Sequence, residues 1–455
     1  MRFLFLLSAF CVLTSSVGSA QWLEARIPAG TEPSAVCLNP LRNKVYCANS
    51  SSANVTVVSA ETNEVIATVT VGAYPLDFCY NSRDDKVYCA SLHGNCVTVI
   101  DGASDSVINT LGALSQAFAL CYNPAENKVY CAVYGADEVS IIDGASDSVL
   151  ATVSVAADPC ALCLDDRDNL VYVGSNLSRN VTVIDGASNQ AIATIETGAD
   201  PIGLCYNSRD NKVYAANYYD DNVAVINCST NQVVAKVPVS GGPRILCYNP
   251  VSNKVYCGSA GGPEYNVTVV DGASDSVRAV LPVQDYPSAL GHDPVNNRVY
   301  CSSLWGNYVA VIDGATDSLL RTIPVGSKPI ALVHSSYLNR TYVAESESDS
   351  IAVLRDSMPA GVTEQKVGDR LGRKPGPTIV RGVLHLGVDS RQHTAFRAEL
   401  LDVSGRRVME LRPGENDIKH LSPGVYFVHQ ASSVMRNASS IVPAASRVTK
   451  VVILR

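Results

Sequence analysis

The chain lacks the sequence motifs of several common enzyme classes. None of its seven histidines lies in an H-E-x-x-H sequence, and no G-x-S-x-G sequence occurs. Zinc proteases and α/β-hydrolases use these spacings to place a metal or a nucleophilic serine, so the sequence supports neither class. Long apolar runs are equally scarce, because the single one, Phe3–Leu13, is too short to span a bilayer. Sustained helical periodicity is missing throughout, which argues against an α-helical fold.

One phrase recurs instead along most of the chain. It reads N-K-V-Y-C-A, then N-V-T-V-I-D-G-A-S-D-S, then V-x-A-T-V-x-V-G-x-x-P and A-L-C-Y-N-P. Its marker tyrosines are 42 residues apart at every step but one, which is 44: Tyr46, Tyr88, Tyr130, Tyr172, Tyr214, Tyr256, Tyr300 and Tyr342. A fixed period of this length is typical of a propeller or a solenoid.

Each repeat contains four short apolar runs that are separated by turn residues. In the third repeat they are Ala119–Tyr122, Lys128–Ala132, Glu138–Ile142 and Ser148–Val153. These runs have the length and the composition of β-strands. Four strands per repeat make one propeller blade, and we call them strands A, B, C and D in chain order.

The number of runs predicts an all-β, eight-bladed β-propeller that is closed by an N-terminal strand. A D-like run, Glu24–Ile27, precedes the first strand A, and the last repeat ends on a C-like run, Ser350–Leu354. Eight complete blades result only if the first strand D joins the last sheet, which would also remove the free sheet edges at the junction. A seven-bladed propeller with one irregular unit is the alternative.

The best-preserved stretches of the repeat are Lys-Val-Tyr-Cys-Ala-Asn, Asn-Val-Thr-Val-Ile-Asp and Ala-Thr-Val-x-Val-Gly-x-x-Pro. They resemble the YVTN β-propeller repeat over about residues 23–357. Val-Tyr-Cys stands here where that family has Tyr-Val-Thr. The resemblance implies a propeller fold, and the family includes surface-layer and periplasmic proteins.

The first 20 residues have the pattern of a secretory signal peptide. Arg2 precedes the apolar run, and Gly18-Ser19-Ala20 supplies small residues at its exit. We expect cleavage after Ala20, so that the propeller comprises residues 21–357. A linker rich in Gly, Pro, Lys and Arg at 358–377 would lead to a small β-sandwich at 378–455. That sandwich is predicted from five strand-like runs: Ile379–Leu386, Ala395–Val403, Arg407–Leu411, Val425–Val428 and Thr449–Leu454.

Three segments of the tail carry a second resemblance. Ala398–Val408 reads A-E-L-L-D-V-S-G-R-R-V, Leu421–Val428 reads L-S-P-G-V-Y-F-V, and Lys450–Arg455 reads K-V-V-I-L-R. They resemble the C-terminal sorting domain of the type IX secretion system, although Ala431–Ser446 is a long Ser/Ala-rich stretch where a tight hairpin is common. The resemblance implies recognition by that machinery, passage through the periplasm and a secreted or cell-surface protein. A plain structural β-domain is the alternative.

Charge differs between the two parts of the chain. Residues 21–357 carry 19 Lys and Arg against 35 Asp and Glu, whereas the tail from Met358 carries 15 against 8. A propeller with a net charge of −16 repels phosphate backbones, so we expect no nucleic-acid partner. An acidic surface suits cations, basic partners or simple solubility.

Cysteine is frequent, with 15 residues, and a secreted protein permits disulfides. Other repeats have Val173, Ala215 or Gly291 at one of the paired cysteine sites, so a free thiol that packs as a small apolar side chain is the favoured interpretation. Disulfides are the alternative, if the partners lie directly opposite each other. The pairs in question are ten residues apart in four A–B hairpins: Cys37/Cys47, Cys79/Cys89, Cys121/Cys131 and Cys247/Cys257.

Two further patterns raise the possibility of a metal or a catalytic site. The sequence Asp-Gly-Ala-Ser-Asp-Ser recurs between strands C and D, first at Asp101, and regular carboxylates could bind calcium. The favoured interpretation is turn capping, because Asp and Ser commonly bind nearby backbone N–H groups. Three histidines, His93, His292 and His334, lie in different repeats and leave open a lactonase-like hydrolase with a site at the channel mouth. We expect no catalytic residue, no metal and no cofactor.

The repeats differ mainly in their B–C and D–A loops. In an up-and-down blade these loops emerge on one side, which we call the variable face, and the nearly constant A–B and C–D turns form the opposite, uniform face. The variable loops combine aromatic and polar residues, a composition that favours contacts with a partner, although drift in unconstrained loops is the alternative. The candidate binding residues on the variable face are Tyr134, Tyr218, Tyr219, Tyr265, Trp305 and Tyr308.

Together these features predict an exported protein that acts as a non-enzymatic binding or structural module. The expected partner is a protein or a polysaccharide of the cell envelope, besides the type IX secretion machinery. No transmembrane segment is expected. A propeller hydrolase and a component of a cell-surface lattice are the alternative functions.

Overall fold

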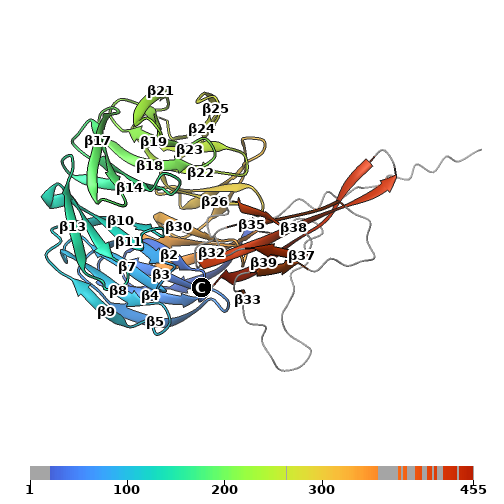
Figure 1. Cartoon of the computed structure of the whole chain (residues 1–455), viewed down its shortest axis with the longest axis horizontal. Helices are drawn as coiled ribbons and strands as arrows, with labels where there is room; N and C mark the ends of the chain where they lie inside the picture. The colour runs from blue at the N-terminus through green and yellow to red at the C-terminus, as the bar shows by residue number, and fades with distance from the viewer. Residues whose placement is uncertain are drawn as a thin grey trace, which may run out of the picture.

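Eight four-stranded antiparallel sheets lie around a central axis within residues 21–356 (Figure 1). The computed structural model describes residues 21–262 and 264–356 and seven strands of the tail. Eight sheets confirm the eight-bladed propeller and exclude the seven-bladed alternative. The predicted signal peptide at 1–20 and the predicted linker at 358–377 lie outside the described residues.

Each blade runs from strand A at the central channel to strand D at the rim. The A strands are β2 (Pro33–Asn39), β6 (Pro75–Asn81), β10 (Ala117–Asn123), β14 (Pro159–Asp165), β18 (Pro201–Asn207), β22 (Pro243–Asn249), β26 (Pro287–Asp293) and β30 (Pro329–Ser335). The B strands are β3 (Lys44–Asn49), β7 (Lys86–Ser91), β11 (Lys128–Val133), β15 (Leu170–Ser175), β19 (Lys212–Asn217), β23 (Lys254–Ser259), β27 (Arg298–Ser303) and β31 (Arg340–Glu345).

The other two strands complete each blade. The C strands are β4 (Asn54–Ser59), β8 (Cys96–Asp101), β12 (Glu138–Asp143), β16 (Asn180–Asp185), β20 (Asn222–Asn227), β24 (Asn266–Asp271), β28 (Tyr308–Asp313) and β32 (Ser350–Asp356). The D strands are β5 (Glu64–Thr70), β9 (Val107–Leu111), β13 (Val149–Ser154), β17 (Gln190–Glu196), β21 (Gln232–Pro238), β25 (Val277–Pro282), β29 (Ser318–Pro324) and, for the last blade, β1 (Gln21–Pro28). Two B–C loops contain short 3-10 helices, η1 (Tyr134–Ala136) and η2 (Ser346–Ser348). We number the blades 1 to 8 from β2.

Burial explains why the four strands differ in composition. Strands B and C are covered on both sides by neighbouring sheets, so they read as continuous apolar runs, and all eight marker tyrosines of strand B are at most 1% exposed. Strand D lies at the rim and keeps large apolar side chains such as Val65 and Ile66 in contact with solvent. The hydrophobic core is therefore a ring of clusters, each lying between two blades.

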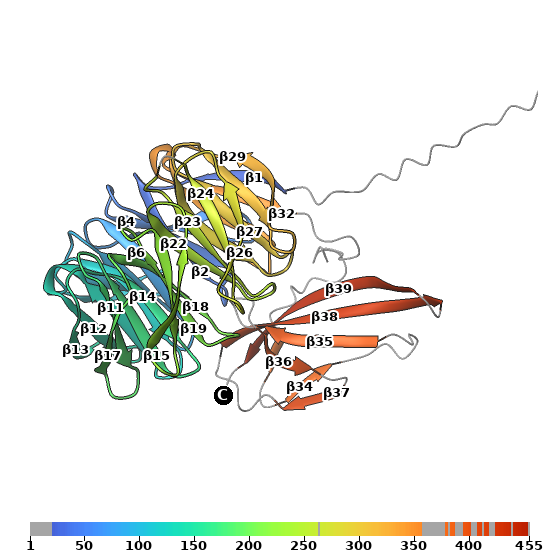
Figure 2. The ribbon, with the colours of Figure 1, turned by 90° about the horizontal axis from the view of Figure 1, so that it is seen from above.

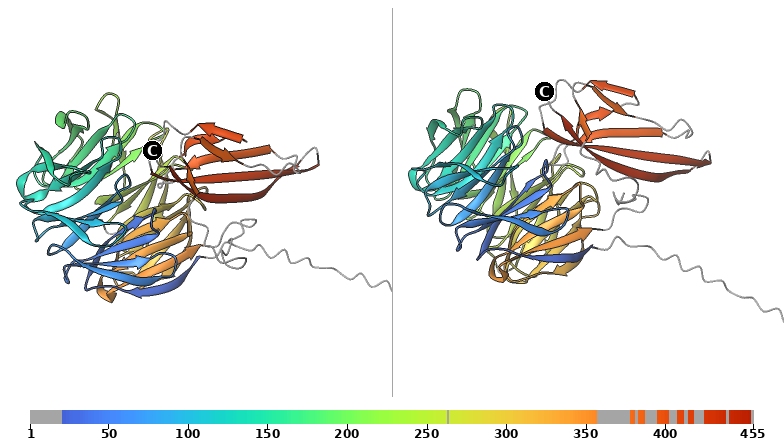
Figure 3. Two further views of the ribbon diagram at one scale, coloured as in Figure 1. Left: turned by 60° about the horizontal axis from the view of Figure 1, so that its bottom comes forward. Right: turned by 90° about the horizontal axis from the view of Figure 1, so that it is seen from below.

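The N-terminal strand closes the ring. Strand β1 pairs antiparallel with β32, from Gln21 opposite Asp356 to Pro28 opposite Ser350. Figure 2 and both views of Figure 3 show the blue first strand beside the orange strands of the last repeat. The Glu24 carboxylate accepts hydrogen bonds from Arg340 at 2.6 and 2.7 Å and from Arg355 at 3.0 Å. Burial raises the pKa of Glu24, but these two cations outweigh it and lower that pKa overall.

The strand register separates the cysteine pairs. All 14 cysteines of the described residues are free. Cys37 lies opposite Tyr46, whereas Cys47 lies opposite Val36, so Cys37 and Cys47 project from opposite sides of the sheet. The condition for a cross-strand disulfide is therefore not met, and the cysteines pack as small side chains that are buried or half-buried. Burial, helped by the charge of Asp77, raises the pKa of the Cys37 thiol to about 12.

The tail strands form a five-stranded and a two-stranded sheet. The larger sheet has the order β33 (Thr378–Val380), β39 (Ser440–Ile453), β38 (Gly424–Asn437), β35 (Ala395–Leu401) and β36 (Arg407–Leu411), and the smaller one pairs β34 (Val383–Leu386) with β37 (Gly414–Asp417). The run Ile379–Leu386 was expected to be one strand but divides into β33 and β34, which join different sheets.

The Ser/Ala-rich stretch continues the strands on both of its sides, and β38 and β39 form one long hairpin, drawn in red in Figure 2. A sandwich of the two tail sheets stays a prediction. No helix in the described parts of the chain is long and apolar enough to cross a membrane.

Candidate functional site

Most candidate binding residues gather on three successive blades of the variable face. Tyr218 and Tyr219 lie in the B–C loop of blade 5, Tyr265 in that of blade 6, and Trp305 and Tyr308 in and after that of blade 7. The inner strands β18, β22 and β26 of these blades are neighbours in the ring. Tyr134 lies apart, in blade 3. Tyr286, in the D–A loop before β26, is not among the sequence candidates. Together with the five candidates of blades 5 to 7 it forms a group of six residues that we call the aromatic arc: Tyr218, Tyr219, Tyr265, Tyr286, Trp305 and Tyr308.

The residues of the arc differ in how far their side chains are exposed to solvent. Tyr219 is 70% exposed and Trp305 56% exposed. The ammonium group of Lys328 lies 4.8 Å from the centroid of the Trp305 ring. Tyr265 and Tyr308 are half-buried against the hydrophobic cluster between blades 6 and 7. Tyr219 and Trp305 therefore present the most free surface.

The remaining aromatic candidates make contacts within the protein. The rings of Tyr218 and Tyr219 meet edge to face, with centroids 5.0 Å apart. Tyr134 stacks on Phe118 at 5.4 Å, and its hydroxyl accepts a hydrogen bond of 3.2 Å from the Asn176 amide. Tyr134 thus has a packing role away from the arc.

The carboxylates of the variable loops are occupied by backbone groups. The Asp137 side chain accepts a hydrogen bond of 2.9 Å from the backbone N–H of Asp158. The Asp221 side chain accepts one of the same length from the N–H of Gly242. Each bond joins a B–C loop to the following D–A loop, so these carboxylates stabilise loops.

A ring of β-bulges borders the channel on the variable-face side. In strand β2, Pro33 pairs with Asn49 and Ala35 with Ala48, so no residue of strand β3 lies opposite Ser34 in the register. The same shift recurs in every inner strand, and a bulge redirects the side chain of the extra residue. The eight half-buried bulge residues are Ser34, Leu76, Phe118, Cys160, Ile202, Arg244, Ser288 and Ile330. Arg244 is the one charged member.

Arg244 lies inside the aromatic arc. Its guanidinium carbon is 5.2 Å from the centroid of the Tyr286 ring, and Tyr286 in turn lies 6.1 Å from Tyr265. Within residues 21–262 and 264–356, the guanidinium has no ion pair and no hydrogen bond to a side chain or backbone carbonyl. Burial lowers the pKa of Arg244, and only the electrostatic influence of Tyr218 acts against it.

The D–A loop before Arg244 contains a glycine, Gly242. Gly242 directly precedes strand β22 and has a φ of 65°, a left-handed conformation that glycine adopts at no cost. A Cβ atom there would lie 3.1 Å from Cε2 of Tyr218 and 2.5 Å from Cα of Gly261. The missing side chain thus lets Tyr218 and the neighbouring loop approach closely. The corresponding residues of the other blades all have side chains: Glu32, Tyr74, Gln116, Asp158, Asp200, Tyr286 and Lys328.

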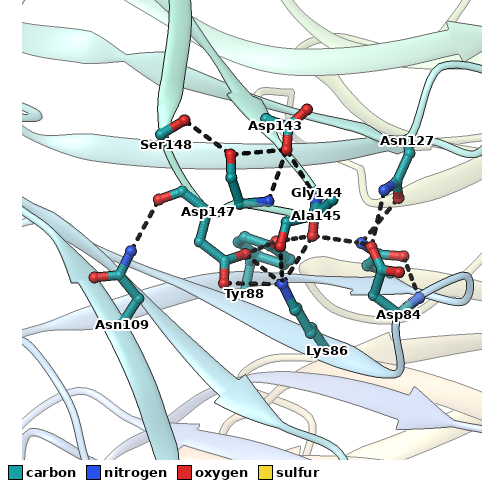
Figure 4. Close-up of polar contacts among 12 residues, drawn as sticks. Asp84, Lys86, Tyr88, Asn109, Asn127, Asp143, Gly144, Ala145, Asp147 and Ser148 are labelled. Carbon is teal, nitrogen blue, oxygen red and sulfur yellow. Dashed lines mark hydrogen bonds and ion pairs between the residues drawn. The ribbon is translucent and has the colours of Figure 1, made fainter.

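On the uniform face, the repeated carboxylates connect neighbouring blades. Lys86 at the start of β7 donates hydrogen bonds of 2.9 Å to the backbone oxygen of Gly144 and to the Asp147 carboxylate of the next blade (Figure 4). The Tyr88 hydroxyl donates to the same carboxylate. The first aspartate of the motif, Asp143, accepts a bond of 2.7 Å from the backbone N–H of Ser146. One aspartate therefore caps the turn and the other binds the preceding blade.

This connection recurs around the ring. A lysine that begins strand B reaches the second aspartate of the next Asp-Gly-Ala-Ser/Thr-Asp-Ser turn in several blades: Lys44 with Asp105, Lys212 with Asp275 and Lys254 with Asp317. In the described residues no group of three or more His, Cys, Asp or Glu side chains could hold a metal ion. The carboxylates that suggested calcium are thus used for turn capping and blade contacts. Turn capping was predicted, whereas the lysine contact was not.

Among the three histidines of the propeller, His93 lies apart from the other two. His93 packs against Tyr74 on the variable face, with ring centroids 4.6 Å apart. His334 lies on β30, where its Nε2 is 3.2 Å from an Asp293 oxygen and its Nδ1 is 3.0 Å from the Thr341 hydroxyl.

Burial closes the His334–Asp293 pair to substrates. The two side chains are 4% and 0% exposed. Burial would raise the pKa of Asp293, but the charge and hydrogen bond of His334 dominate and lower it to about 2. Burial also lowers the pKa of the neighbouring His292 to about 4. The His334 and Asp293 side chains are thus enclosed within the protein.

Residues 2–294 match the model of a family described as YNCE-like beta-propeller. No curated protein matches the chain in sequence. Among solved structures, Sqt1 of Saccharomyces cerevisiae is 13% identical, with a TM-score of 0.65 over 75% of this chain and 100% of that chain. Hydrazine synthase of Kuenenia stuttgartiensis is 17% identical, with a TM-score of 0.52 over 71% of this chain and 96% of that chain. The dihydro-heme d1 dehydrogenase NirN, in complex with DHE, is 14% identical, with a TM-score of 0.56 over 65% of this chain and 66% of that chain. At these identities the likeness concerns the fold alone.

Proposed function

The chain belongs to the YNCE-like β-propeller family, and from this premise we propose that it is an exported binding module without catalytic activity. The observation that carries the proposal is the aromatic arc on three neighbouring blades, where the rings of Tyr219 and Trp305 are exposed and Trp305 lies beside Lys328. Large, rigid side chains with polar neighbours are efficient contact residues because little conformational entropy is lost on binding. The proposed partner is a protein or a polysaccharide of the cell envelope.

The test is capture of envelope material by the purified full chain. Cell-envelope polysaccharide and secreted protein are offered separately, each with and without calcium. The double variant Tyr219→Ala/Trp305→Ala should lose the captured partner. The matched control is Tyr337→Ala, because Tyr337 is 40% exposed but follows an A strand on the uniform face. Equal capture by the wild type and the double variant would contradict the proposal, and self-assembly of the purified chain would favour a lattice component instead.

Export is the second part of the proposal. It is supported by the signal-peptide pattern of residues 1–20 and by the likeness of the tail to a type IX sorting domain. We expect the exported protein to begin at Gln21, which the intact mass measures. Deletion of 378–455 should retain the propeller in the periplasm. A deleted form that still reaches the surface would rule out sorting by the tail.

A further inference from the structure

Arg244 lies at the mouth of the channel and has no anionic partner among the described residues of the propeller. It is the bulge residue of the inner strand β22, and its seven counterparts in the other blades are uncharged. A charge that is partly withdrawn from water is costly unless an opposite charge or hydrogen bonds compensate it. Within residues 21–262 and 264–356 no carboxylate does so, although the propeller is strongly acidic. A negatively charged ligand would supply the missing partner.

The neighbouring tyrosines indicate what kind of anion fits. The guanidinium carbon lies 5.2 Å from the centroid of the Tyr286 ring, and a cation–π contact does not use up the N–H donors of the guanidinium. A guanidinium binds a carboxylate through two parallel hydrogen bonds, a match of shape as well as of charge. The rings of Tyr218 and Tyr286 add flat apolar surfaces with hydroxyl groups, which suit the face of a sugar ring.

The overall charge limits the ligand further. A propeller with a net charge of −16 repels densely charged polymers over a long range. A ligand with one carboxylate on an otherwise neutral ring would gain the contact with Arg244 and meet the least repulsion. A uronic acid has this combination of groups.

We propose that Arg244, Tyr218 and Tyr286 form a binding site for a uronate, a sugar ring that bears one carboxylate. This site rests on the proposed binding function and names the chemical class of ligand for one end of the aromatic arc. Gly242, which has no side chain, lets Tyr218 lie close to the loop that precedes Arg244. The carboxylate binds the N–H donors of Arg244, and the sugar ring lies against the tyrosines.

Titration calorimetry on the full chain tests the site, with galacturonate as the probe. Galactose lacks the carboxylate and acetate lacks the ring, so each should bind about tenfold or more weakly than galacturonate, because a hydrogen bond to a charged group is lost or the ring contact is missing. Arg244→Gln should reduce galacturonate affinity to that of galactose. The matched control is Arg209→Gln, which removes an exposed arginine of the uniform face in the preceding blade and should change nothing.

Further variants keep the test informative if one of them folds poorly. Arg244→Lys retains the charge but not the planar pair of donors, so galacturonate should bind more weakly than to the wild type and more tightly than to Arg244→Gln. Tyr286→Ala should weaken galacturonate and galactose alike. Circular dichroism confirms that each variant is folded.

Three results would overturn the site: no galacturonate binding by the wild type, equal affinity for galacturonate and either control compound, or unchanged binding by Arg244→Gln. Capture of an envelope partner without galacturonate binding would remove this site and leave the proposed function standing. Galacturonate binding without capture of an envelope partner would support this site and contradict the proposed function.

Discussion

The uniform face and the variable face are built from the same repeats but are held together differently. On the uniform face, Lys86 and Tyr88 cross to the Asp147 carboxylate of the next blade. On the variable face, the Asp221 carboxylate stays within its own repeat and binds the backbone N–H of Gly242. Lysine–aspartate contacts between blades thus recur on the uniform face, whereas side-chain caps between the loops of one repeat recur on the variable face.

This difference explains which residues the repeats share. A side chain that binds the next blade must match a partner about 60 residues later, such as Asp105 for Lys44, so both residues recur together. A loop cap needs only one acceptor for one backbone N–H, and the other loop residues are free to differ. Chemical variety on the variable face is therefore compatible with a fixed ring, and a ligand site can arise there in one blade without changing the others.

The largest expected effect breaks a contact between blades. Lys86→Ala leaves the Asp147 carboxylate largely buried with only the Tyr88 hydroxyl and removes two further bonds to backbone oxygens. We expect the free energy of unfolding to fall by about 3 kcal/mol, as for other half-broken buried ion pairs. Urea denaturation measures it. The control Lys236→Ala removes an exposed lysine from strand β21 and should change stability little; equal losses in the two variants would refute the role of the blade contact.

The sequence predicted the architecture far better than the site. The 42-residue period and the run at Glu24–Ile27 predicted eight blades and their closure, because each blade repeats the same burial pattern. Six aromatic candidates were found from the variability of the loops, but spacing could not tell exposed Trp305 from half-buried Tyr308. Arg244 was missed because its role depends on a bulge and on rings from two neighbouring blades, which period analysis does not reveal. Its signal was one charged residue at a position that is otherwise uncharged.

A smaller effect concerns a buried departure from the repeat. Asp77 follows the bulge of β6, where the other inner strands have Ala35, Ala119 or similar uncharged residues, and it accepts a hydrogen bond of 2.8 Å from the N–H of Leu120. Burial raises the pKa of Asp77 to about 6. The folded state therefore holds a proton that the unfolded chain has released between about pH 4 and pH 6, and stability falls as the pH rises through this window.

Asp77→Asn keeps an acceptor for Leu120 but removes the buried charge. We expect it to raise the free energy of unfolding at pH 7 by about 2 to 3 kcal/mol and to have little effect at pH 4. Urea denaturation at the two pH values measures the difference. Glu64→Gln, on the exposed strand β5, is the control and should show no such dependence. A stabilisation of Asp77→Asn that is the same at both pH values would contradict the buried-charge explanation.

The smallest expected effect separates contact from packing within the aromatic arc. Tyr219→Ala and Trp305→Ala should each change the free energy of unfolding by about 0.5 kcal/mol or less, because both side chains are mostly exposed. For Trp305→Ala, most of this change is the lost contact with Lys328, which at an exposed site contributes about 0.5 kcal/mol. Tyr308→Ala lies in the same arc but removes a ring from the cluster between blades 6 and 7, so it should cost about 2 kcal/mol. Urea denaturation of the three variants gives the order directly. If Trp305→Ala were as destabilising as Tyr308→Ala, the Trp305 ring would contribute to the stability of the fold. That result would contradict the proposal that the exposed rings of the arc form a contact surface for a partner.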